Sequence, residues 1–316
     1  MGNKLIVTAA PHITGPDTTQ KIMQRVCIAL LPTLIASILI FGFNSLILTV
    51  ISVAACVFFE WGYCKLTGRE VPVGDFSAAV TGVLLAFNLP ATLPWWMAIV
   101  GAFIAIVIVK QLFGGLGYNV ANPAIVARIA LAMGFASRMA NYPHPANGID
   151  ALASATPLAV SGDLGAANYV TLLLGNHGGV LGETCTITLL LGGIYLIATK
   201  VISPVIPVTY LATVAVLSAV SGHDPIVQLL SGGLMLGAFF MATDYVTSPT
   251  TNKGKLVFGI GLGIITCAIR FLGTMNEGVS FAILLMNLLV PYIEILTRQD
   301  RLGIAKAKAK KEGAAK

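Results

Sequence analysis

The chain has 316 residues, of which 56% are hydrophobic and only 10% are charged. Soluble domains carry about a quarter charged residues, so this composition excludes an ordinary soluble protein and indicates a polytopic membrane protein. The net charge of +6 comes mostly from lysines in the tail and loops, which favours a topological role over nucleic-acid binding. The first 22 residues are polar, so no cleavable signal peptide is expected.

Ten apolar segments predict an all-helical transmembrane bundle. A bilayer core of about 30 Å needs roughly 20 apolar residues per helix. The candidate spans are 23–43, 45–63, 76–89, 95–112, 123–138, 182–199, 205–221, 226–242, 256–272 and 280–297. The third and fifth are short, which indicates broken or re-entrant helices inside the bundle. We expect a membrane domain at 23–297, after an N-terminal segment, 1–22, and before a Lys-rich tail, 298–316.

Basic residues predict the orientation of the bundle. If the N-terminus is cytoplasmic and ten helices alternate, nearly all lysines and arginines fall on the cytoplasmic side. This asymmetry follows the positive-inside rule, so both termini are expected in the cytoplasm. The interval 139–181 then faces the extracytoplasmic side, whereas the polar segments 114–123 and 243–251 face the cytoplasm.

The two halves of the predicted bundle carry a faint internal repeat. The third span ends at 86–92 and the eighth at 242–245, and both are Gly- and Leu-rich helices that stop at a polar, proline-containing break. Because five helices is an odd number, two such halves would have opposite orientations, which is the inverted-repeat plan of transporters. Chance similarity between apolar helices would give the same impression.

Cysteine and histidine spacing predicts no metal centre. The five cysteines lack C-x-x-C spacing and lie mostly inside apolar segments, as small buried hydrophobes do. They are Cys27, Cys56, Cys64, Cys185 and Cys267. The four histidines are equally dispersed. We therefore predict no iron–sulfur, zinc or haem site.

The expected cytoplasmic side carries three candidate binding residues. The Gly-Gly-Leu-Gly run at 114–117 lacks dinucleotide-binding spacing and is open to interpretation as a flexible connection. Asn119 and Asn122 favour a ligand-binding role for this segment, because an amide offers both a donor and an acceptor to the edge of a planar heterocycle. Pro123 fits as the first residue of the next helix. Asp244 is an ionisable residue at a membrane helix end, which makes it a functional candidate, although it also suits a local cap.

Two further acidic residues have simple structural explanations. Glu183 opens the sixth predicted helix, where the helix dipole alone favours a carboxylate in the first turn. Glu60 lies towards the cytoplasmic end of the second helix, where it is expected to snorkel.

The longest polar interval holds the stretch DALASATP at 150–157. Small residues surround Thr156, so a large reactant could reach its hydroxyl. Runs of Ser, Ala and Thr are also common at helix starts, where Ser154 would act as an N-cap. The residues alone leave both interpretations open.

Four segments together resemble the RnfD/NqrB family, which spans the Rnf complex and the sodium-pumping NADH:quinone reductase. They are FGGLGYNVANPA at 113–124, DALASATP at 150–157, GET at 182–184 and TDYVTSP at 243–249. Each is weak alone, but together they keep the family's order across most of the membrane domain. The short chain lacks the longer N-terminal region of the quinone reductase members, which favours Rnf.

The resemblance implies a covalent FMN, joined through its phosphate to a threonine in a pattern like D-x-x-S/T-G-A-T. Carried over to this sequence, the phosphoester falls on Thr156. The FMN surroundings would comprise Asp150, Ser154, Glu183 and Thr184. The sequence departs from the pattern at Ala153 and Ser154, which bears on recognition by the flavin transferase.

The resemblance also implies a non-covalent riboflavin near the cytoplasmic side, with Asn119 and Asn122 as contacts, and ion movement in which Asp244 is the candidate. The expected role is a membrane electron-transfer subunit of a ferredoxin:NAD⁺ oxidoreductase that exports Na⁺ or H⁺. The expected partners are the lipid bilayer and the other Rnf subunits, including a second covalent-FMN subunit and membrane iron–sulfur subunits. The expected location is a bacterial or archaeal inner membrane. The alternatives are the corresponding component of the quinone reductase and, in another class, a flavin-free transporter or channel.

Overall fold

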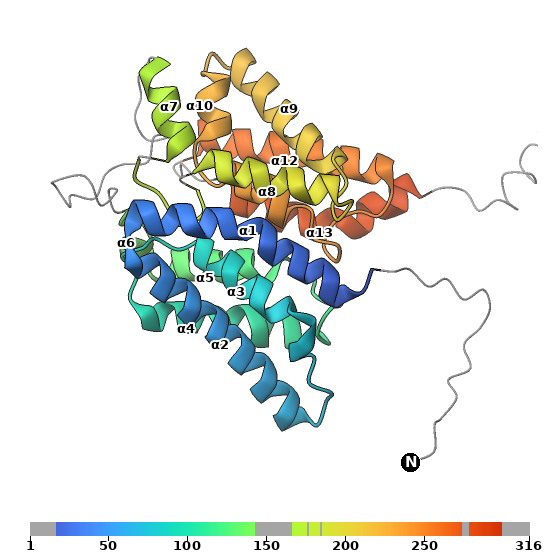
Figure 1. Ribbon diagram of the computed structural model, residues 1–316. Coiled ribbons are helices and arrows are strands. Elements are labelled where there is room, and N and C mark those ends of the chain that lie inside the picture. The colour runs from blue at the N-terminus through green and yellow to red at the C-terminus, as the bar shows by residue number, and fades with distance from the viewer. Residues whose placement is uncertain (1–16, 143–165, 176, 184, 274–277, 299–316) are drawn as a thin grey trace, which may run out of the picture.

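The computed structural model describes residues 17–142, 166–175, 177–183, 185–273 and 278–298. Every regular element within these ranges is a helix (Figure 1), which confirms the all-helical expectation. The Lys-rich tail beyond 298 and most of the predicted loop 139–181 lie outside the described residues.

A helix occupies each of the ten predicted positions. The N-terminal half contains α1 (Thr19–Phe41), α2 (Phe43–Thr67), η1 (Val73–Asp75), α3 (Ser77–Phe87), α4 (Trp95–Phe103), η2 (Ile104–Gln111), α5 (Pro123–Gly134) and α6 (Ala136–Met139). The C-terminal half contains α7 (Ala166–Leu174), α8 (Thr186–Ala198), α9 (Val205–Val220), α10 (Pro225–Leu230), α11 (Leu234–Leu236), η4 (Gly237–Met241), α12 (Asn252–Leu272) and α13 (Val279–Thr297).

Helix length divides these elements into two groups. Among the described residues, four helices are long and apolar enough to cross a bilayer, namely α1, α2, α12 and α13. As predicted, α3 and α5 are short, with 11 and 12 residues. The multi-pass character of the chain is therefore confirmed.

The predicted continuous eighth span is wrong in detail. It is divided into α10 and the α11–η4 segment by a break at 231–233. Gly232 has φ of 69° there, a left-handed conformation that glycine adopts without steric cost. The break is therefore encoded by the Ser-Gly-Gly sequence, which the hydropathy of the segment conceals.

The two halves meet along α1 and α8, which lie side by side at the centre of the molecule (Figure 1). Their close approach depends on Gly192, because a Cβ at this position would lie 2.3 Å from the carbonyl oxygen of Ala29. Within the first half, Gly82 similarly lets α3 approach α2, because a Cβ at this position would lie 2.6 Å from the Cα of Val53. Small residues commonly allow such backbone contact between membrane helices.

We predict that Gly192→Ala destabilises the fold by about 1–3 kcal/mol, because the added methyl group overlaps the α1 backbone, which cannot move aside cheaply. Thermal unfolding of the purified protein in detergent measures this effect. Gly62→Ala is the matched control, since a Cβ at this α2 position meets nothing within 4 Å. Equal melting temperatures for the two variants would show that α1 and α8 do not pack as described.

Candidate functional site

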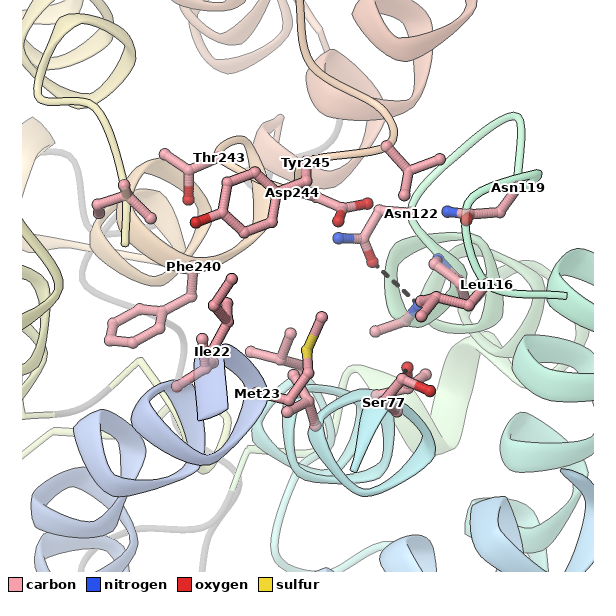
Figure 2. Close-up of a pocket in the computed structure, with 18 of the residues that line it drawn as sticks. Ile22, Met23, Ser77, Leu116, Asn119, Asn122, Phe240, Thr243, Asp244 and Tyr245 are labelled. Atoms are coloured by element: carbon pink, nitrogen blue, oxygen red, sulfur yellow. Dashed lines mark hydrogen bonds between the residues drawn. The ribbon is translucent and has the colours of Figure 1, made fainter. Parts of the chain in front are cut away.

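A cavity that is partly open to solvent lies between the two halves, at the end of the bundle where α1 and α3 begin. Its walls are mostly apolar and come from both halves (Figure 2); they include Met23, Val80, Leu84, Leu116, Phe239 and Phe240. The polar residues in the walls come from several segments and include Asn119, Asn122 and Asp244. Apolar walls with a few convergent polar groups are usual for small-molecule sites. Three residues that the sequence singled out, two in segment 113–124 and one in segment 243–249, thus line the same cavity.

The glycine run at 114–117 forms a specific turn rather than a loose connection. Gly114, Gly115 and Gly117 have φ angles of 126°, 97° and 93°, which L side chains rarely adopt. The Gly115 N–H donates to the Lys110 carbonyl at 3.0 Å, so the turn is tied to the end of η2. This turn carries Asn119 to the edge of the cavity.

Asn122 is the N-cap of α5, and Pro123 follows at the first helical position as predicted. The Asn122 Oδ1 accepts from the N–H groups of Ala124 at 3.1 Å and Ile125 at 3.4 Å. Its Nδ2 donates to the Met241 carbonyl of η4 at 3.4 Å. The amide therefore has a structural role that sequence reasoning did not foresee, and ligand contact by Asn122 stays a prediction.

Asn119 and Asp244 face one another across the cavity edge (Figure 2). The Asn119 Nδ2 donates to the Ala121 carbonyl at 3.2 Å, and the Asn119 side chain lies near enough to the Asp244 carboxylate to favour its charged form. Thr247 Oγ1 donates to Asp244 Oδ2 at 3.0 Å, as the local-cap interpretation expected. Asn119 Oδ1 has no donor among the residues that the structure describes, which leaves it available to a ligand.

Asp244 lies in the segment between η4 and α12, outside the spanning helices. Burial raises the pKa of its carboxyl group above the ordinary value, although interactions with Thr247, Asn119 and two backbone N–H groups oppose the rise. A carboxylate that is costly to keep charged gains stability from a proton or a cation beside it.

The expectation that Glu60 snorkels is wrong. Glu60 is fully buried, and its Oε1 lies 2.6 Å from Lys110 Nζ. Lys110 also donates to Ser77 Oγ at 2.6 Å and lines the cavity. Sequence reasoning used Lys110 only as a topological charge. The sequence did contain an indication of this ion pair, because an ionisable residue lies in each of two apolar spans and such residues usually pair with one another.

Two of the helices that end at the cavity finish in π-helical segments. The first, η2 (Ile104–Gln111), contains Lys110. The second, η4 (Gly237–Met241), ends shortly before Thr243 and Asp244. π-Helical turns are rare and frequently occur at functional sites, because the wider turn re-aims the side chains that follow. Hydropathy does not reveal this feature.

A second buried polar cluster lies at the opposite end of α3. The expectation that Glu183 opens a helix is wrong, since α8 begins at Thr186 and Glu183 precedes it. The Glu183 carboxylate instead pairs with Arg128 of α5 at 3.2 Å, and Arg128 also donates to Asn88 Oδ1 at 2.8 Å. Gly182 fits here because a Cβ would lie 2.5 Å from that of Phe87.

The remaining predicted flavin residues, Asp150, Ser154, Thr156 and Thr184, lie outside the described residues. Of the predicted FMN surroundings, the structure describes only Glu183. The described cysteines are free thiols, buried or half-buried, and the described residues contain no cluster of potential metal ligands.

Comparison with known proteins shows similarity along nearly the whole chain. The model of the NQR2, RnfD, RnfE family matches residues 6–303. The chain is 46% identical to the D component of the Na⁺-translocating ferredoxin:NAD⁺ oxidoreductase complex of Acetobacterium woodii, over 96% of this chain and 97% of that protein. It is 38% identical to the D component of the proton-translocating ferredoxin:NAD⁺ oxidoreductase complex of Clostridium ljungdahlii, over 95% and 97% of the two chains.

A third relative is the D component of the ion-translocating oxidoreductase complex of Stutzerimonas stutzeri, at 38% identity over 91% of this chain and 93% of that protein. The matched residues include the glycine turn, the 150–157 stretch, Glu183 and Asp244 within one continuous family region. This chain belongs to the NQR2, RnfD, RnfE family.

Proposed function

We propose that the chain is the RnfD-type membrane subunit of a ferredoxin:NAD⁺ oxidoreductase complex and couples electron flow to translocation of Na⁺ or H⁺. Near-complete coverage of relatives named as such subunits supports the assignment. The observation that carries it is the cavity where the glycine turn and the Thr243–Asp–Tyr segment meet. The two ferredoxin relatives are named for different ions, so similarity alone leaves the ion open.

The cavity suits a riboflavin bound without a covalent link. Its apolar walls match a flat ring system, and the free Oδ1 of Asn119 can accept a hydrogen bond from the heterocycle. Lys110 also lines the cavity, and its ammonium group is paired with the Glu60 carboxylate at 2.6 Å. A bound flavin supplies one- and two-electron redox chemistry, whereas the protein's residues orient it and exclude water.

The second cofactor that we propose is an FMN attached through a phosphoester to Thr156. Support comes from the order of the four family segments in the sequence. Glu183 and Arg128 form a buried ion pair at the opposite end of α3 from the cavity, and polar groups at this end suit the surroundings of the FMN. The proposed partners are other subunits of the complex, including a second covalent flavoprotein and iron–sulfur subunits, to which the two flavins would pass electrons.

The proposed setting is a prokaryotic inner membrane with both termini in the cytoplasm. The basic residues of the sequence support this orientation. The riboflavin cavity then opens to the cytoplasmic side and Thr156 faces outward. Asp244, whose carboxyl lies beside the cavity, is the candidate for the ion pathway.

Two other functions remain distinguishable by experiment. Reduction of quinone rather than NAD⁺ by the assembled complex would identify the Nqr context. A purified complex in which this chain carries neither covalent FMN nor riboflavin would favour a flavin-free transporter or channel.

We expect Thr156→Ala to abolish covalent flavin on this chain while the complex still assembles, because the phosphoester needs the hydroxyl oxygen. In-gel flavin fluorescence and peptide mass spectrometry measure the outcome. Ser161→Ala, in the same polar interval of the sequence, is the control and should keep full fluorescence. Undiminished fluorescence of the Thr156 variant would place the flavin elsewhere.

We expect Asn119→Leu to lower bound riboflavin about tenfold, because an apolar isostere leaves a polar ligand edge unpaired. Chromatography of acid-released riboflavin, per polypeptide of purified complex, gives the occupancy. Tyr118→Phe is the control, since this neighbour is 71% exposed. Unchanged riboflavin in Asn119→Leu would contradict a binding role.

We expect Asp244→Asn to impair ion translocation more than ferredoxin-dependent NAD⁺ reduction, because the amide cannot take up a proton or balance a cation. Ion uptake and NAD⁺ reduction are measured on the same proteoliposomes. Asp17→Asn serves as control, since Asp17 pairs with Arg25 at the surface, at 3.0 Å, and such exposed pairs contribute little. Equal loss of both activities would mean that Asp244 is a structural residue.

A further inference from the structure

Asn287 is a buried amide in the middle of an apolar helix. It lies on α13 within the sequence Leu-Met-Asn-Leu-Leu and is 2% exposed. Pro291 follows four residues later and has no N–H to donate to the Asn287 carbonyl, so the helical hydrogen-bond ladder is interrupted at this residue. An amide in such a place is costly unless its hydrogen bonds are made inside the protein.

The orientation of the amide that satisfies its neighbours gives it three partners. Its nitrogen donates to the carbonyls of Ile283 at 3.2 Å and Thr247 at 3.1 Å, and its oxygen accepts from the Asn122 N–H at 3.1 Å. Only the Ile283 bond is local to α13. The other two reach segments 40 or more positions away in the sequence, one in each half of the molecule.

One distant partner, Asn122, lines the cavity, and the other, Thr247, contacts a residue that lines it. Asn122 begins α5 and follows the glycine turn, so it fixes the wall of the first half. Thr247 donates to the Asp244 carboxylate, so it fixes the wall of the second half. On the cavity side, Asn119 of the first half and Asp244 of the second both line the cavity, so the two walls also approach one another there (Figure 2). Asn287 does not line the cavity but joins its two walls from behind.

We propose that Asn287 is a positioning residue that sets the separation of the two cavity walls and thereby the affinity for the bound flavin. The inference rests on the riboflavin proposal above and names a residue that acts through Asn122 and Asp244 rather than on the ligand. Leucine is nearly isosteric with asparagine and suits an apolar helix, so packing alone would favour it at this position. Both distant hydrogen bonds would be lost with leucine, whereas the filled volume would remain.

The test uses the purified complex with Asn287→Leu in the full-length chain. Three quantities are measured: riboflavin per polypeptide, its rate of release on dilution, and covalent flavin fluorescence. Asn287→Asp is the second variant, since a carboxylate keeps the acceptor for the Asn122 N–H but faces the Thr247 and Ile283 carbonyls without a donor. Ser280→Ala is the control, because Ser280 is also buried on α13.

We expect both Asn287 variants to release riboflavin on the order of tenfold faster, as for loss of a buried hydrogen-bond partner. Covalent flavin, assembly and the Ser280→Ala variant should be unaffected. Wild-type release rates in Asn287→Leu would overturn the inference while leaving the riboflavin proposal intact. Parallel loss of covalent flavin or of assembly would also overturn it, because Asn287 would then be a general packing residue. Absence of riboflavin from the wild-type complex would instead refute the proposed function itself.

Discussion

A broken helix inside a membrane bundle exposes backbone carbonyls and N–H groups that water cannot reach, and the rest of this structure depends on satisfying them. At the start of α5, the Asn122 side chain accepts from two of the free N–H groups. At the end of α10, Arg270 of α12 donates to the carbonyls of Gln228 at 2.6 Å and Ser231 at 3.1 Å. Side chains on one helix thus complete the ends of another.

The same constraint explains why charged residues accompany the breaks. Lys110 reaches Ser77 at the first residue of α3, and Arg270 reaches the residues just before α11. In the first half, Lys110 of the α4–η2 segment contacts the start of α3. In the second half, Arg270 of α12 contacts the residues before α11. This parallel agrees with the predicted repeat, although the sequences of the two helices differ. A buried cation needs a partner, and Glu60 provides one for Lys110.

Hydropathy predicted where the helices lie because the bilayer imposes length and polarity on each span independently. The position of Pro123 was also predictable, because the preference of proline for the first helical position depends only on neighbouring residues. Ionisable residues in two apolar spans indicated a pair at Glu60 and Lys110, but the partner of Glu183 and the distant partners of Asn287 were not predictable, because these contacts join segments about 40 or more residues apart. Local rules assigned Glu60 to snorkelling and Glu183 to a helix start, and tertiary contacts overrode both. Asn119, Asn122 and Asp244 were found as candidates, but only the fold shows that Asn122 is already engaged as a cap.

Buried and half-buried ionisable groups occur at both ends of α3. At the cavity end, the half-buried Asp244 carboxyl lies beside the cavity, and Glu60 pairs with Lys110. At the other end, Arg128 pairs with Glu183, and the half-buried Arg270 lies close enough to Glu183 to affect its ionisation. A carboxylate that burial makes costly to charge gains stability from a proton or a metal cation, whereas a guanidinium gains it from an anion. A translocated cation near Asp244 and a flavin phosphate near Arg128 would each supply such a partner. The placement of these groups therefore suits the arrangement of ion and cofactors that the family segments suggest.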